Sequence, residues 1–141
     1  MTGLNEFFGA KTVINAKTAK IEIEIMIDSA KPKLRNKEFQ DAIDIYNNAK
    51  NLAINWNLSS VIENLDDLIR LAQINGLKEL KEIYINQAIS AENGYNYTVA
   101  VDNYDKAIKI TSEIFKLGDN EIQKELRKLK KKKKGISSIL S

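Results

Sequence analysis

Few of the side chains that catalyse reactions occur in this chain of 141 residues. It has no histidine and no cysteine. Their absence removes the commonest general base near neutral pH, the usual paired nucleophiles and the common ligands of zinc. Disulfide bonds are excluded for the same reason. Because catalysis would have to rest on carboxylates, lysine or tyrosine alone, we expect a non-catalytic protein without a metal or a cofactor.

The acidic residues and the glycines support the same expectation. Asp66 and Asp67 are adjacent, so on a helix their side chains point apart. Glu79 and Glu82 are typical of a solvated helix face. The six glycines are scattered singly, so no glycine-rich loop is present that could hold a phosphate. We therefore predict that the chain is not an enzyme.

The strongest charge signal lies at the C-terminal end. Residues 1–123 carry 14 basic and 18 acidic side chains, whereas residues 124–141 carry 8 basic and 1 acidic, so the net charges are −4 and +7. Such a stretch could bind nucleic acid or an anionic lipid surface. The candidate residues form a lysine run: Lys128, Lys130, Lys131, Lys132, Lys133 and Lys134.

Two further features bear on the lysine run. No aromatic residue is interleaved with the lysines, so base stacking is not indicated. The apolar residues that follow, up to Leu140, could help to seat the run at a membrane interface. The alternative is a solvated helix end, where positive charge favours the helix dipole.

The elements that must position these residues are indicated by an internal repeat. Two segments align when Ile25 is placed on Ile83, and small and aromatic residues match best. An Ala–Tyr–Ala pattern recurs at the spacing of one helix face, and a further alanine precedes each copy at the same distance. The two sets are Ala30, Ala42, Tyr46, Ala49 and Ala88, Ala100, Tyr104, Ala107. Because small residues let two helix backbones approach closely, each copy predicts a pair of antiparallel helices.

This skeleton resembles the tetratricopeptide repeat family. An aromatic residue three before the second alanine (Phe39, Tyr97) and a bulky residue four before the first (Met26, Tyr84) fit the family pattern. No proline closes either unit, and the period is 58 instead of about 34 because a third helix follows each pair. The three-helix period is also similar to the microtubule-interacting-and-transport domain, which fits best at residues 77–134.

We therefore predict an all-α fold, an antiparallel array of six or seven helices in two three-helix units. Pro32 should kink or end the first repeat helix, and Asn75-Gly76 should separate the third helix from the fourth. The alternation of isoleucines from Ile21 to Ile27 favours a strand, but its aligned copy has helical periodicity. The predicted domains are 1–17 (a segment that could form a capping helix), 18–76, 77–134 and a short tail at 135–141. The predicted repeat helices cover 18–36, 38–57, 60–74, 77–92, 96–116 and a stretch from 119 through the lysine run.

The family resemblance implies a groove that binds a peptide or a partner helix. Its ligand-facing positions fall on the first helix of each unit, at Ile27, Lys31, Leu34, Arg35, Ile85, Ile89, Glu92 and Asn93. The alternative is that the apolar members pack against a neighbouring helix. Lys31 aligns with Ile89 and Arg35 with Asn93, so the two units would not present the same surface. The chain is thus expected to be an adaptor or scaffold with one asymmetric partner site.

The cellular setting is predicted from what the sequence lacks. It has no apolar run long enough to span a membrane and no basic start followed by an apolar stretch, so we expect a cytoplasmic protein. The expected partner is another protein or peptide, with anionic lipid or nucleic acid as the alternative. A second copy of the chain is a further candidate, because so short an array could bury an exposed end in a homodimer.

Overall fold

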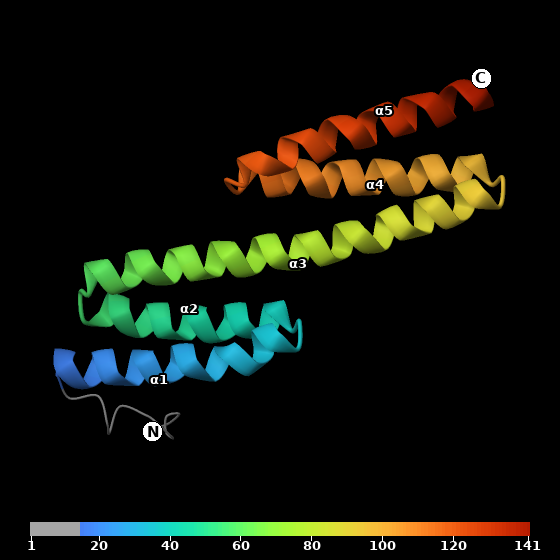
Figure 1. Ribbon diagram of the computed structural model, residues 1–141. Helices are drawn as coiled ribbons and strands as arrows, with labels where there is room; N and C mark the ends of the chain where they lie inside the picture. The colour runs from blue at the N-terminus through green and yellow to red at the C-terminus, as the bar shows by residue number, and fades with distance from the viewer. Residues whose placement is uncertain (1–14) are drawn as a thin grey trace. The chain divides into compact units, whose positions relative to one another are not determined.

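Residues 15–141 are described by a computed structural model, and they fold entirely into helices and short turns (Figure 1). The predicted all-α class is confirmed. The described residues contain five α-helices and one short 3₁₀ helix, η1, where six or seven helices were predicted. Their bounds are α1 Ala16–Arg35, α2 Phe39–Asn55, α3 Ser59–Asn93, α4 Tyr97–Lys116, η1 Asn120–Ile122 and α5 Gln123–Leu140.

The lower helix count follows from α3. The predicted third and fourth helices are one continuous helix, so the expected stop at Asn75-Gly76 is wrong. Ile74 is buried and Leu77 packs beside it, in an apolar cluster with side chains from α4 and η1. This burial on both sides of Gly76 outweighs the helix penalty of one glycine, which is about 1 kcal/mol. The residues predicted to form a capping helix lie largely outside the described part of the chain.

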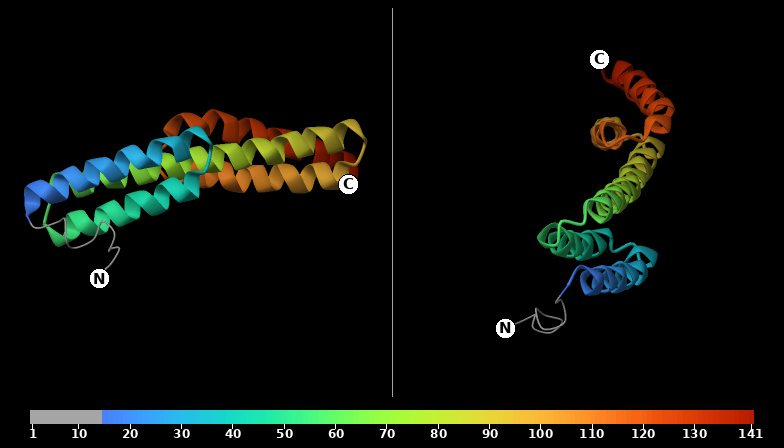
Figure 2. Two further views of the ribbon diagram at one scale, coloured as in Figure 1. Left: turned by 90° about the horizontal axis from the view of Figure 1, so that it is seen from below. Right: turned by 90° about the vertical axis from the view of Figure 1, so that its left-hand side faces the viewer.

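The chain divides into two compact units at Gln73 and Ile74, within α3. In the first unit, α1 and α2 lie side by side (Figure 2), and the N-terminal half of α3 adds to their core. The alanines at the helix contact are fully buried, and Tyr46 is only 2% exposed. The core residues are Ile23, Ala30, Ala42, Ile43, Tyr46, Ala49, Ala53, Leu65 and Ala72.

The second unit repeats this arrangement with the C-terminal half of α3, α4 and α5. Here Tyr104 is 2% exposed and is again flanked by fully buried alanines. Leu129 and Ile136 of α5 complete the same core. The shared core residues are Ala88, Ala100, Tyr104, Ala107, Ile108, Leu129 and Ile136.

The turns inside the two helix pairs show that the repeat extends to the backbone. Lys37 and Tyr95, which are equivalent positions of the two units, both adopt a positive φ, 61° and 62°. The N–H of Lys37 donates to the carbonyl of Leu34, and the N–H of Tyr95 donates to that of Glu92. Each hydrogen bond ends a helix in the same left-handed cap. The sequence offset between equivalent positions of the two units is larger at the next turn, where Asn57 corresponds to Gly118, because α4 has 20 residues and α2 has 17.

Three local predictions have clear outcomes. The isoleucine-rich segment is helical, as predicted, since α1 covers it completely. Pro32 does not end α1, which continues to Arg35. The missing N–H of Pro32 removes one helical hydrogen bond, and only three residues of α1 follow it. Most of the predicted tail, residues 135–141, is also helical, because α5 extends to Leu140.

Candidate functional site

The predicted groove positions of the first unit divide between core and solvent. Ile27 and Leu34 are half-buried and pack against the core cluster. Lys31 is exposed and forms an ion pair 3.0 Å from Asp28, one turn away on the same helix. Arg35, the last residue of α1, is exposed. Only the two basic members therefore face outward.

The second unit divides its predicted positions in the same way. Ile85 packs against the core, whereas Ile89 and Asn93 are exposed. Glu92 is occupied within the unit: it accepts a hydrogen bond from the Tyr104 hydroxyl at 3.0 Å and pairs with Lys132 at 3.2 Å. Glu92 is therefore a structural partner of α4 and α5, which the sequence pattern did not indicate.

The exposed positions of the two first helices correspond. Six residues of α1 are exposed along one side, and the six residues at the equivalent positions of α3 are exposed as well. We call these the outer faces. Each carries two exposed isoleucines, from 44% to 51% accessible. The outer faces are Ile21, Glu24, Ile25, Asp28, Lys31 and Arg35 in unit 1 and Glu79, Glu82, Ile83, Asn86, Ile89 and Asn93 in unit 2.

The lysine run does not act as one group. Lys133 pairs with Asp105 of α4 at 2.9 Å, and Lys132 pairs with Glu92 of α3. The hydrogen bond from Lys133 lowers the pKa of the Asp105 carboxyl, which holds it charged. The other four lysines of the run are exposed and form no ion pair with residues 15–141. The sequence prediction therefore combined side chains with two different roles.

Charged residues also connect α5 to the C-terminal half of α3. Lys81 is 5% exposed and pairs with Glu125 at 2.6 Å and Glu82 at 3.2 Å. Burial lowers the pKa of Lys81, but the hydrogen bonds to Glu125 and Glu82 outweigh that effect, so its pKa is raised. Lys81 occupies the position that the buried Ile23 holds in the first unit, which is why apolar periodicity could not have found it.

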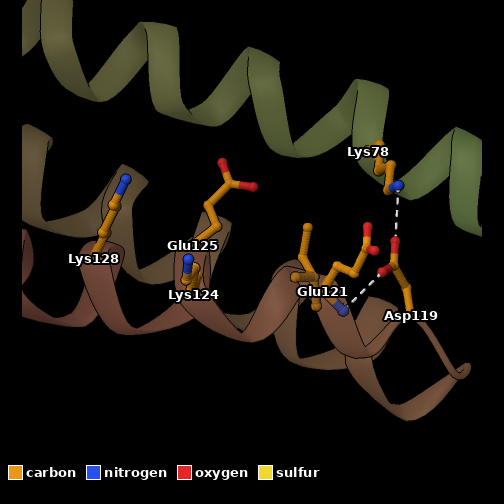
Figure 3. Close-up of a pocket in the computed structure, with 7 residues that line it drawn as sticks. Lys78, Asp119, Glu121, Lys124, Glu125 and Lys128 are labelled. Atoms are coloured by element: carbon orange, nitrogen blue, oxygen red, sulfur yellow. Dashed lines mark hydrogen bonds and ion pairs between the residues drawn. The ribbon is translucent and has the colours of Figure 1, made fainter.

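A cavity of about 440 Å³ lies beside this connection (Figure 3). At one end Lys78 pairs with Asp119 at 2.8 Å, and Asp119 also accepts from the backbone N–H of Glu121. The hydrogen bond from Lys78 lowers the pKa of Asp119. The charges are mixed in sign, so the cavity does not select an anion or a cation. Its lining residues are Lys78, Asp119, Glu121, Ile122, Lys124, Glu125 and Lys128.

Residues 15–141 contain neither a metal-binding group nor a membrane-spanning helix. No three carboxylates of this part of the chain lie close enough together to hold a metal ion. None of its helices has the length and apolar character needed to cross a membrane.

Comparison with known proteins does not place the chain in a family. It matches no family model, no curated protein and no solved structure.

Proposed function

We propose that the chain is a non-catalytic, tetratricopeptide-like interaction module that binds a segment of a partner protein on its outer faces. One observation carries the proposal. The alanines and tyrosines of the helix contact are buried alike in both units, whereas four of the six equivalent positions on the outer faces carry different residues. A repeated scaffold with divergent surfaces is the expected arrangement of a recognition array.

The exposed isoleucines suit an apolar anchor of the partner. Ile25 and Ile83 are equivalent positions, and each is 51% exposed. Charged residues border them, notably Asp28, three residues after Ile25, and Glu79, four residues before Ile83. Apolar centres with charged rims are typical of surfaces that bind a peptide or helix. The adaptor or scaffold role that we propose follows from this surface, with Ile85 now assigned to the core.

The proposal is tested by affinity capture from extract of the source cells, followed by measurement of direct binding to each recovered protein. The test variants are Ile21→Asp with Ile25→Asp, and Ile83→Asp with Ile89→Asp. Ile139→Asp is the matched control, since Ile139 is 60% exposed but lies on α5. We expect at least one pair to reduce partner affinity more than tenfold while the control does not. Unchanged affinity in both pairs, with helix content retained, would contradict the proposal.

A homodimer would bury the same isoleucines, so the mass in solution is measured before the capture. Sedimentation equilibrium of the wild type and both double variants distinguishes the two cases. A monomer supports binding of a different protein. A dimer that dissociates in either double variant assigns the outer face to self-association instead.

A further inference from the structure

Four ion pairs fix the orientation of α5, and of the turn that precedes it, within the second unit. Lys78 holds Asp119, Lys81 holds Glu125, Glu92 holds Lys132 and Asp105 holds Lys133. Leu129 and Ile136 are buried on the inner side of the same helix. Apolar burial and charge pairing therefore agree on which side of α5 faces inward.

The solvent side of α5 carries six exposed cations, of which Lys124 and Lys128 line the cavity described above. We call the other four the basic diamond: Arg127, Lys130, Lys131 and Lys134. Its members recur at the helical spacing of three and four, so they are neighbours on the helix surface. All four are exposed, and none forms an ion pair within the described part of the chain. Like charges at this spacing repel one another and destabilise the helix. No acidic residue lies between Arg127 and Lys134 to offset them.

The helix dipole does not account for these charges. Its effect is confined to the first and last turns of a helix. Because α5 continues beyond Lys134 to Leu140, its last turn contains no basic residue. The first unit gives a second argument. When Asn57 is aligned with Gly118, the corresponding positions are Asp66, Ile69, Arg70 and Gln73, with one basic residue among them. The basic diamond is therefore not a requirement of the repeated scaffold.

We propose that the basic diamond binds the anionic headgroups of a lipid membrane. The side chains lie on the exposed side of one helix, away from the buried Leu129 and Ile136, which suits a flat surface. Ile139 is 60% exposed, but it lies five residues beyond Lys134 and projects from a different side of α5, so it takes no part in the proposed contact. The inner apolar side of α5 is already buried in the unit, so attachment would be peripheral. Nucleic acid is less favoured, because α5 has no aromatic side chain on which bases could stack.

The test is co-sedimentation of the full chain with phosphatidylcholine vesicles that contain or lack phosphatidylserine. We expect binding only when phosphatidylserine is present, and a steep loss of binding as salt rises. Each cation near an anionic membrane contributes about a fivefold change in affinity. Lys130→Gln with Lys131→Gln should thus weaken binding about 25-fold.

Lys17 and Lys20, which are exposed on α1, provide a matched control, because changing both to Gln removes the same formal charge without altering the ion pairs that hold α5. We expect this variant to weaken binding clearly less than the Lys130 and Lys131 variant. Equal losses would overturn the proposal, since the vesicles would then respond to overall charge and not to the basic diamond. Absence of binding to phosphatidylserine vesicles would overturn it directly.

Direct comparison with an RNA oligonucleotide separates membrane from nucleic acid, because the basic diamond should bind the phosphatidylserine vesicles more tightly than the RNA at the same salt. An RNA affinity higher than the vesicle affinity at the same salt would overturn the membrane assignment. Neither result depends on the outer faces, so this test and that of the interaction module can fail separately.

Discussion

The two buried tyrosines offer a sharp test of how the second unit is held together. Tyr46 and Tyr104 occupy equivalent positions and are each 2% exposed. The Tyr104 hydroxyl donates to Glu92, whereas the Tyr46 hydroxyl forms no hydrogen bond within the described residues. The counterpart of Glu92 in the first unit is Leu34. Changing each tyrosine to phenylalanine therefore removes the same atom from two environments that differ in one partner.

The expected magnitudes follow from that partner. A hydrogen bond to a charged acceptor contributes about 1.5–3 kcal/mol. Because the Glu92 side chain is 27% exposed and keeps Lys132, solvent and the ion pair offset part of the loss. We expect Tyr104→Phe to lower the free energy of unfolding by about 1–2 kcal/mol, and Tyr46→Phe to change it by less than about 0.5 kcal/mol. Urea denaturation followed by circular dichroism measures both values.

The same pair of variants has an independent readout in the titration of the phenols. Burial, together with the hydrogen bond and charge of Glu92, raises the pKa of Tyr104 to about 12. Above pH 10 an unfolded tyrosine ionises first, so the contribution of Tyr104 to stability falls as the pH rises from 10 towards 12. Ultraviolet titration of Tyr104→Phe should lack the phenol that titrates last. Equal destabilisation by both variants, or a normal pKa for Tyr104, would refute the assigned role of Glu92.

Four other outcomes are expected. Glu125→Ala should lower the free energy of unfolding by about 1–3 kcal/mol in urea denaturation, because it leaves the buried Lys81 with one carboxylate. Lys81→Ile, which introduces the residue of unit 1, should leave that free energy unchanged or raise it. A larger loss for Lys81→Ile than for Glu125→Ala would contradict this account. Lys37→Gly should raise the free energy of unfolding by about 0.5–1 kcal/mol, since glycine adopts positive φ without strain; no gain would argue against strain at that turn. Glu22→Leu should raise the free energy of unfolding by about 1–3 kcal/mol, because Oε2 of the buried Glu22 has no hydrogen-bond partner within the described residues. A destabilised variant would show that Glu22 has a partner. Asp105→Asn should reduce the loss of stability in acid. Because the pKa of Asp105 is lowered in the folded state, its contribution to stability is present above the unfolded pKa and is lost as the pH falls through the folded pKa. An unchanged midpoint of acid unfolding would exclude that contribution.

The sequence predicted the helices and the alanine contacts well because both depend on local periodicity. Ala42, Tyr46 and Ala49 lie on one helix face whatever the surrounding fold, and their copy allowed the isoleucine-rich segment to be assigned as helix. The stop at Gly76 was wrong because a glycine is a stop signal only where the chain must turn. Whether it turns depends on what Ile74 and Leu77 contact, and local periodicity does not show that.

The candidate surfaces were harder to predict because charge partners come from distant parts of the chain. Nothing in the order Lys132, Lys133, Lys134 distinguishes the paired lysines from the unpaired one. The distinction depends on Asp105 of the preceding helix, and on the rotation of α5 about its axis. Three apolar groove positions, Ile27, Leu34 and Ile85, pack against the core, whereas Ile89 is exposed. The family pattern does not separate a core contact from a ligand contact.

The differences between the units follow a common direction. Ile23 and Leu34 of the first unit correspond to Lys81 and Glu92 of the second, and both charged residues pair with α5. Apolar contacts tolerate small rotations of a helix, whereas a hydrogen-bonded ion pair fixes its partner at one angle. Because neither the buried pair of Lys81 nor the partly exposed pair of Glu92 should add much stability, the two replacements are better explained by orientation than by energy. The orientation that they impose is the one that turns Arg127, Lys130, Lys131 and Lys134 towards solvent.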